Sequence, residues 1–217
     1  MIEEQNEKTL KQRIYSGSAA WGRGLLYGYM YAAFRPKLIY MGRETKAQIS
    51  QQPVIYAANH TCHNDGQMML TLFRQSGLLM AKDWMEKKII KWVVTGTNCI
   101  PIDRFGLDTA WLREAASCIK AGNDVVIFPE GHTSKNGVPD EFKSGFVMLS
   151  VMTGAPIVPV YIDGEYHNFI GKRLRIYIGK PVEITAEGKG LRADYLTAES
   201  ERFRTMICKM KGAVKNG

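Results

Sequence analysis

The sequence has only four cysteines, and their spacing matches no common disulfide framework. No two of the four cysteines form a Cys-x-x-Cys pair, and they do not make the dense pattern of a small disulfide-rich domain. We therefore expect reduced thiols, as in a cytosolic setting, at Cys62, Cys99, Cys118 and Cys208.

We also predict no secretory leader, internal repeat, low-complexity tract or linker. The first residues are acidic where a signal peptide carries basic ones. The chain has 217 residues, which suits one domain with a sizeable core. Because 45% of the residues are apolar and 23% are charged, the composition is that of a folded globular protein rather than a disordered one.

Basic residues outnumber acidic ones, which gives a formal net charge of +8. Such an excess attracts anionic partners: membrane surfaces, phosphorylated substrates, acidic carrier proteins or nucleic acid. No nucleic-acid-binding motif is recognisable, so we predict no nucleic-acid partner. A basic module that binds membranes or nucleic acid without catalysis is kept as the non-enzymatic alternative.

An aromatic segment, residues 19–34, stands out near the start of the chain. Arg23 is its only charge, and it holds one tryptophan and three tyrosines. Its uncharged part, residues 24–34, has eleven residues, whereas a transmembrane helix needs roughly twenty. Tryptophan and tyrosine rings favour the headgroup region of a bilayer. We therefore predict that residues 1–35 form a helical membrane-interface anchor, with a buried core helix as the alternative.

From residue 36 onwards, short apolar runs alternate with helical patterns. Strands are predicted at residues 37–41, 54–58, 78–81, 99–102, 125–128, 157–162 and 174–178. Helices are predicted at residues 65–75, 83–94, 108–121 and 144–152, with a last helix that starts at Thr197 as N-cap and a short one within residues 3–16. The alternation predicts an α/β fold for residues 36–217, with a mostly parallel or mixed sheet flanked by helices.

Polar clusters follow three of the predicted strands, at residues 59–60, 103–104 and 129–134. Ligands of doubly wound sheets gather beyond the carboxyl ends of the strands, so we expect the clusters to converge. Within them, His60 is the side chain best suited to move protons near neutral pH. A carboxylate from Asp65 would fix its tautomer and stabilise the imidazolium. We also expect backbone amides near Asp65 and Gly66 to stabilise a developing oxyanion.

Four sequence blocks occur in a specific order. They are residues 59–65 (Asn-His-Thr-Cys-His-Asn-Asp), 100–104 (Ile-Pro-Ile-Asp-Arg), 128–134 (Phe-Pro-Glu-Gly-His-Thr-Ser) and 155–160 (Ala-Pro-Ile-Val-Pro-Val). In these blocks, and in the spacing from about Pro36 to Pro181, the chain resembles the glycerolipid acyltransferase family, of the bacterial 1-acyl-sn-glycerol-3-phosphate (lysophosphatidic acid) acyltransferase type. One block would be weak evidence, whereas four in order are specific.

The resemblance implies an O-acyltransferase domain over residues 36–217 and a role for each matched residue. His60 would be the general base on the acceptor hydroxyl, and Asp65 would orient it. Arg104 would hold the acceptor's phosphate, and Glu130 and Gly131 would shape the acceptor pocket. The fourth-block proline, Pro159, would be structural or line the acyl-donor side.

The resemblance also implies the partners of the reaction. The acceptor would be lysophosphatidic acid, the product phosphatidic acid, and the donor an acyl thioester of acyl carrier protein or coenzyme A. No cofactor and no metal are implied. The expected location is the cytoplasmic face of a membrane, peripheral or monotopic.

Departures from the family pattern leave alternatives open. Cys62 and His63 occupy the interior of the first block, and His132 stands where the third block commonly has threonine or a basic residue. These differences keep another lysolipid acceptor open, such as a lyso-ornithine lipid or another lysophospholipid. Cys62 could act as a nucleophile instead of filling space, and a histidine and carboxylate metal site is conceivable. Arg104 could pair with Asp103 rather than with phosphate.

Overall fold

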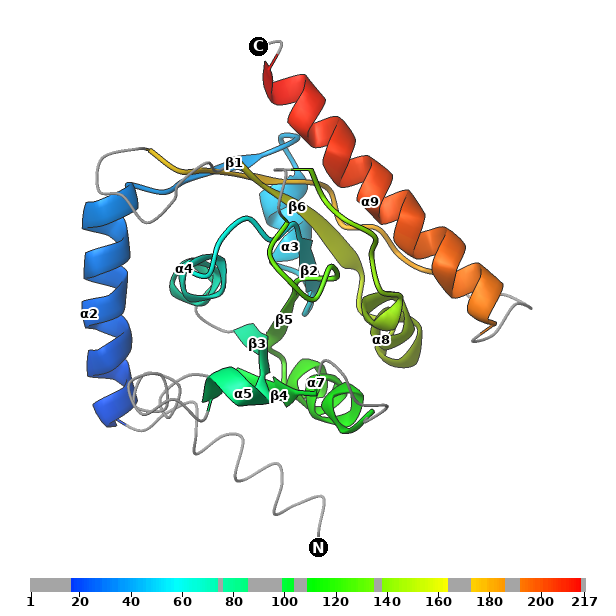
Figure 1. Ribbon diagram of the computed structural model, residues 1–217, viewed down its shortest axis with the longest axis horizontal. Helices are drawn as coiled ribbons and strands as arrows, with labels where there is room; N and C mark the ends of the chain where they lie inside the picture. The colour runs from blue at the N-terminus through cyan, green and yellow to red at the C-terminus, as the bar shows by residue number, and fades with distance from the viewer. Residues whose placement is uncertain are drawn as a thin grey trace, which may run out of the picture.

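The computed structural model describes residues 17–73, 76–85, 99–103, 109–134, 138–163, 173–185 and 192–215. Within these ranges one seven-stranded sheet has the order β1-β7-β6-β2-β5-β3-β4 (Figure 1). Its strands are β1 (Lys37–Tyr40), β2 (Ile55–Ala58), β3 (Ser76–Ala81), β4 (Cys99–Ile102), β5 (Asp124–Ile127), β6 (Ile157–Asp163) and β7 (Arg175–Ile178). The pairings are parallel except that of β6 with β7, so the predicted α/β fold with a mostly parallel sheet is confirmed.

Helices cover both faces of this sheet (Figure 1). The described helices are α2 (Gly17–Phe34), α3 (Thr45–Ile49), α4 (Asp65–Leu72), α5 (Lys82–Met85), α7 (Ala110–Lys120), α8 (Gly145–Thr153) and α9 (Ala193–Lys215). Side chains of β2 point alternately to the two faces. Tyr56 and Ala58 join a hydrophobic cluster with α2 and α4, whereas Ile55 and Ala57 join a second cluster with α7, α8 and α9.

The strand order places a topological switch point, where ligand crevices form, at the carboxyl end of β2. The chain leaves β2 into α4 on one face of the sheet, and it leaves the neighbouring strand β5 towards α8 on the other face. In open parallel sheets ligands bind where the connections diverge in this way, outside the carboxyl ends of the strands. The fold therefore directs the residues that follow β2 and β5 towards one site.

Most predicted elements agree with the structure, and the differences have physical causes. The last helix starts at Ala193, so Thr197 as its N-cap is wrong. Leu196 extends the buried face by one turn, and the Tyr195 hydroxyl donates a hydrogen bond to the Thr185 carbonyl at 3.0 Å. The short helix α3 was not expected, and α4 ends at Leu72 rather than at residue 75. The helix predicted within residues 3–16 and most of the one at 83–94 lie outside the described residues.

Helix α2 has a buried face and an exposed apolar face. Met30, Ala33 and Phe34 are buried against the cluster that contains α4. Leu25 and Tyr29 are 69% and 55% exposed. Among the described residues, no helix combines the length and hydropathy needed to span a bilayer. The helix therefore packs on the core and also presents an apolar surface, while the division of the chain after residue 35 stays a prediction.

Pro159 of the fourth block lies inside the sheet. It is buried in β6, and its carbonyl accepts a hydrogen bond from the Gly179 amide at 2.9 Å. A Cβ atom on Gly179 would lie 2.7 Å from Cγ of Pro159, closer than real Cβ contacts. The proline ring therefore packs where the chain leaves β7, and these contacts support the structural role among the two considered for it.

A partly buried carboxylate at the opposite end of the sheet from the crevice makes stability depend on pH. Asp124 accepts a hydrogen bond from the Val54 amide at 2.9 Å and one from the Tyr56 hydroxyl. Burial outweighs both hydrogen bonds and raises the pKa of Asp124 to about 6. A raised pKa means that the contribution to stability is complete below the unfolded-state pKa of about 4 and is lost as the pH rises through about 6.

We expect Asp124→Asn to gain stability relative to the wild type as the pH rises. Between pH 4.5 and pH 7.5 the difference in unfolding free energy should shift by about 2 kcal/mol in favour of the variant. Urea denaturation at both pH values measures this shift. Asp194→Asn, the same change at a side chain that is 66% exposed, is the control, and an unchanged difference for Asp124→Asn would contradict the prediction.

Candidate active site

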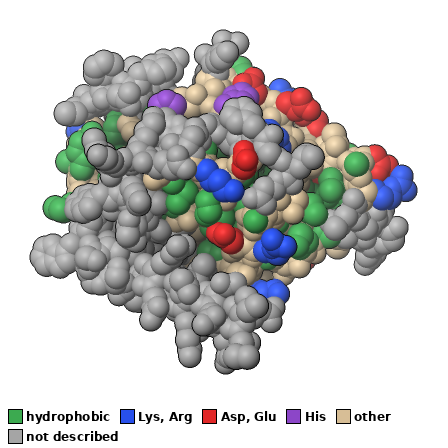
Figure 2. All heavy atoms as spheres, turned by 60° about the horizontal axis from the view of Figure 1, so that its bottom comes forward, with side chains coloured by type: hydrophobic (Ala, Val, Ile, Leu, Met, Phe, Trp, Pro, Cys, Tyr) green, Lys and Arg blue, Asp and Glu red, His purple; other side chains and the backbone are tan. Residues whose placement is uncertain are grey.

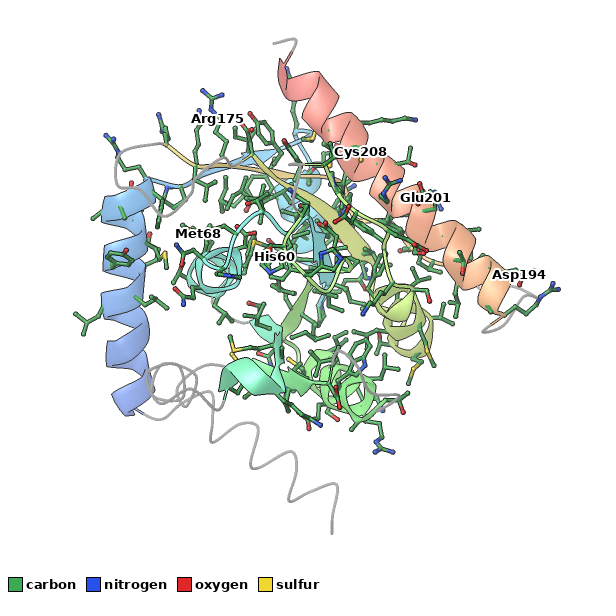
Figure 3. The ribbon with its side chains drawn as sticks, viewed as in Figure 1. His60, Met68, Arg175, Asp194, Glu201 and Cys208 are labelled. Carbon is green, nitrogen blue, oxygen red and sulfur yellow. The ribbon has the colours of Figure 1, made fainter. Side chains whose placement is uncertain are left out.

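His60 and Asp65 form a hydrogen-bonded pair at the carboxyl end of β2. Nδ1 of His60 lies 2.9 Å from Oδ2 of Asp65, the first residue of α4. The Asp65 side chain is fully buried, whereas that of His60 is 18% exposed and lines a cavity. Figure 3 shows His60 near the centre of the molecule, next to α4. Because Nδ1 is occupied by the carboxylate, Nε2 is the nitrogen left to face a substrate.

The turn between these two residues wraps around the carboxylate of Asp65. The backbone amides of Thr61 and Cys62 both donate hydrogen bonds to Oδ2 of Asp65, and the Thr61 hydroxyl donates to Oδ1 at 3.2 Å. This explains why four residues separate His60 from Asp65: the intervening turn supplies the donors that hold the carboxylate in place. Both amides, those of Thr61 and Cys62, are therefore already used as hydrogen-bond donors to Asp65.

The loop after β5 holds His60 from the other side. The His60 ring stacks on Phe128, with ring centroids 4.4 Å apart and an interplanar angle of 22°. The His60 amide donates a hydrogen bond to Oε1 of Glu130 at 2.8 Å. The amide and the hydroxyl of Ser134 both donate to the His60 carbonyl at 2.8 Å. Two of the predicted clusters, residues 59–60 and 129–134, are therefore brought together.

Glu130 is a buried connector within this arrangement. Its side chain is 1% exposed, and its second oxygen, Oε2, accepts a hydrogen bond from the Asp140 amide at 2.9 Å. Burial raises the pKa of the Glu130 carboxyl, while the Asp140 and His60 amides and the Ser134 hydroxyl act in the opposite direction. Gly131 lines the cavity and Glu130 does not. Substrate contact by either residue stays a prediction.

A cavity of about 390 Å³ opens in front of His60. Its polar lining residues include His60, His63, His132 and Lys143, and its apolar lining comes from β3, Trp111 and Phe146. Figure 2 shows histidine, charged and hydrophobic side chains close together on one face of the molecule. A cavity lined by both polar and apolar side chains suits an amphipathic ligand.

The remaining predicted site residues are placed less completely. Arg104 lies outside the described residues, while its neighbour Asp103 lines the cavity at the end of β4. His132 lies 3.7 Å from the carboxylate of Asp140 and is half exposed. Over the described part of the chain, no group of three or more histidine, cysteine, aspartate or glutamate side chains is arranged to hold a metal ion.

Cys62 lies in the turn between His60 and Asp65 but does not line the cavity. Its Sγ accepts a hydrogen bond from the Asn64 amide at 3.3 Å, and its side chain packs against the hydrophobic cluster under α4. These contacts favour the space-filling role over a nucleophilic one.

Asn59 is a supporting residue for which the sequence predicted no role. Its side chain is 1% exposed. Its Oδ1 accepts a hydrogen bond from the Ile162 amide at 2.7 Å, and its Nδ2 donates to the Ile162 carbonyl at 3.2 Å. These two hydrogen bonds link the end of β2 to β6, just before His60. The sequence signal for this supporting role was a polar residue directly after a buried strand.

Several curated proteins are similar to this chain over part of their length. A 1-acyl-sn-glycerol-3-phosphate acyltransferase from Cocos nucifera is 30% identical over 149 residues, which is 65% of this chain and 46% of that protein. The enzyme of that name from Pseudomonas aeruginosa is 25% identical over 154 residues, 67% of this chain and 59% of that protein. The chloroplastic enzyme BAT2 from Brassica napus is 27% identical over 117 residues, 53% of this chain but only 34% of that protein.

The fold is shared with a solved structure. The 1-acyl-sn-glycerophosphate acyltransferase PlsC from Thermotoga maritima superposes with a TM-score of 0.63 at 21% identity, covering 97% of this chain and 83% of that one. The chain also matches the family model described as Acyltransferase over residues 38–163, which is more than half of its length and includes all four blocks. The chain therefore belongs to the Acyltransferase family.

Proposed function

We propose that this chain is an O-acyltransferase that moves a fatty acyl group from a thioester to the free hydroxyl of lysophosphatidic acid, forming phosphatidic acid. The observation that carries the proposal is the pair of His60 and Asp65, joined at 2.9 Å, with His60 lining a cavity of mixed polar and apolar side chains. The similar proteins from Cocos nucifera and Pseudomonas aeruginosa are named 1-acyl-sn-glycerol-3-phosphate acyltransferases, which supports the same acceptor.

The reaction requires one proton transfer and one substitution. Nε2 of His60 removes the proton of the acceptor hydroxyl as its oxygen attacks the thioester carbonyl. The C–S bond then breaks, and the thiolate leaves with the proton that the imidazolium returns. Asp65 stabilises the imidazolium and keeps Nδ1 protonated. A thioester is already activated, so the reaction needs neither a cofactor nor a covalent intermediate on Cys62.

Gly66 is the candidate donor to the oxyanion. The Thr61 and Cys62 amides already serve Asp65, whereas Gly66 lines the cavity in the first turn of α4. Backbone amides at the start of a helix suit a developing negative charge. Arg104 stays the proposed phosphate ligand from the second block.

An acceptor panel tests the assignment. Purified protein receives acyl-coenzyme A or acyl carrier protein thioester together with lysophosphatidate, lyso-ornithine lipid or another lysophospholipid. Preference for lysophosphatidate supports the proposal. Preference for another lysolipid would favour the second candidate function, acyl transfer to that lysolipid. The observation that favours this candidate is the unusual His132, which lines the cavity. Absence of transfer to every lysolipid would refute both, and the donor that reacts faster identifies the thioester.

We also propose that α2 rests on an anionic membrane at the cytoplasmic face. Its exposed stripe of Leu25, Gly28, Tyr29 and Ala32 carries no charge and has helical spacing. A basic cluster, defined by its exposed side chains, lies where α2 ends and consists of Arg35, Lys37, Arg173 and Arg175. An apolar stripe beside a basic cluster suits the interface of a bilayer with anionic lipids.

We expect the double variant Leu25→Asp, Tyr29→Asp to bind phosphatidylglycerol vesicles roughly tenfold more weakly or worse, because two exposed apolar side chains lose their burial in the bilayer. Vesicle co-sedimentation measures the bound fraction. Reversal of one charge in the basic cluster, Arg175→Glu, should weaken binding to anionic vesicles (Figure 3). Lys120→Glu makes the same change at the exposed end of α7, on the other face of the sheet from α2, and should have less effect. Equal binding by all variants would contradict membrane docking through α2.

A further inference from the structure

Lys143 lies outside the four sequence blocks but lines the cavity. It stands two residues before α8, and its backbone amide donates a hydrogen bond to the Pro129 carbonyl at 3.0 Å. Pro129 opens the loop that also holds His60. The backbone of Lys143 is therefore fixed to the same loop as the proposed general base.

The side chain of Lys143 runs across Gly131. A Cβ atom added to Gly131 would lie 3.3 Å from Nζ, 3.5 Å from Cε and 3.8 Å from Cδ of Lys143. Gly131 also has a φ of +73°, which side chains other than glycine rarely adopt. Its neighbour Glu130 accepts the hydrogen bond of the His60 amide. The missing side chain of Gly131 thus lets the lysine ammonium lie at the wall of the cavity that His60 also lines.

Two acidic side chains of this loop, those of Glu130 and Asp140, have other partners. Both oxygens of Glu130 accept backbone hydrogen bonds, and Asp140 faces His132 at 3.7 Å. Within the described ranges, no carboxylate lies within salt-bridge distance of the Lys143 ammonium. A cation at a cavity wall with no counter-ion among the described residues is suited to an anionic ligand.

We propose that Lys143 binds the phosphate of the acceptor lipid, and that Gly131 acts by giving the lysine room rather than by touching the substrate. This inference rests on the proposed function. In lysophosphatidate only a few bonds separate the phosphate from the hydroxyl, so its binding group has to lie near His60. Phosphate groups also occur in coenzyme A and in the prosthetic group of acyl carrier protein, and the experiment separates these sources.

The test compares Lys143→Met, which removes the charge at similar length, with Lys143→Arg, which keeps it. The acceptors are octanoyl lysophosphatidate and monooctanoylglycerol, which lacks the phosphate. Loss of a charged hydrogen bond should raise the KM for the lysophosphatidate about tenfold to a hundredfold in Lys143→Met. The KM for acyl-coenzyme A and kcat/KM for monooctanoylglycerol should stay unchanged, and Lys143→Arg should recover most of the affinity. Gly131→Ala should raise the same KM while leaving the charge in place.

Binding of octanoyl lysophosphatidate without a donor, measured by calorimetry, separates the inference from the proposed function. Weaker binding by Lys143→Met than by wild type supports the inference even if no acyl transfer occurs. Wild-type kinetics and binding in Lys143→Met would overturn it while the proposed function stands. A rise in the KM for the thioester alone, or no binding by the wild type, would also overturn it. Thermal unfolding of each variant checks that Lys143, an exposed residue, has not altered the fold.

Discussion

His60→Ala should lower acyl transfer to lysophosphatidate at least a thousandfold without unfolding the protein. General base catalysis typically contributes about 10² to 10⁴-fold, and a thousandfold corresponds to roughly 4 kcal/mol of activation free energy. The loss should fall on kcat, because the proposed general base acts in the transition state while the variant leaves the apolar lining of the cavity intact. Radiolabelled acyl transfer under saturating donor and acceptor measures kcat directly.

Two further variants make this result specific to the pair. Asp65→Asn should also lower kcat, since an asparagine nitrogen facing the Thr61 and Cys62 amides cannot accept their hydrogen bonds and the imidazolium loses its carboxylate. Cys62→Ser should retain most of the activity, because the thiol packs against the core and a serine oxygen can accept from the Asn64 amide. A large loss in Cys62→Ser with activity kept in His60→Ala would instead indicate a cysteine nucleophile.

The strands and the histidine–aspartate pair were accessible from the sequence because both depend on neighbours in the chain. Buried strands appear as short apolar runs, and the pair is joined by a single turn whose amides hold Asp65. Thr197 was a misleading signal for the opposite reason. A threonine in front of an apolar face is typical of an N-cap, but the burial of Leu196 extends the helix beyond it.

Contacts between distant segments were not accessible in the same way. The placement of β2 between β5 and β6 depends on pairings across the whole chain. The hydrogen bond from the His60 amide to Glu130 joins residues 70 positions apart. The approach of Lys143 to Gly131 depends on the absence of a side chain at a residue in another loop. No local sequence pattern predicts such contacts, so the residues that support the site could be identified only from the structure.

Glu130→Gln should lower kcat about a hundredfold, through the position of His60. Both carboxylate oxygens of Glu130 accept backbone hydrogen bonds, from His60 at 2.8 Å and from Asp140 at 2.9 Å. Glutamine has one acceptor oxygen, so its NH₂ group would face one of the two amide donors inside the protein. An unsatisfied buried donor costs roughly 1–3 kcal/mol, and a displacement of about 1 Å in a catalytic group can cost about a hundredfold in rate.

The way in which this loss divides between kcat and KM decides what Glu130 does. A positioning role predicts a lower kcat, a KM for lysophosphatidate within about twofold of wild type, and a loss of roughly 1–3 kcal/mol in urea denaturation. Contact with the acceptor, the role implied by the family resemblance, predicts a raised KM with kcat largely kept. Glu141→Gln makes the same change at an exposed neighbour and should alter neither. Because the Glu130 side chain is only 1% exposed and does not line the cavity, we expect the kcat effect.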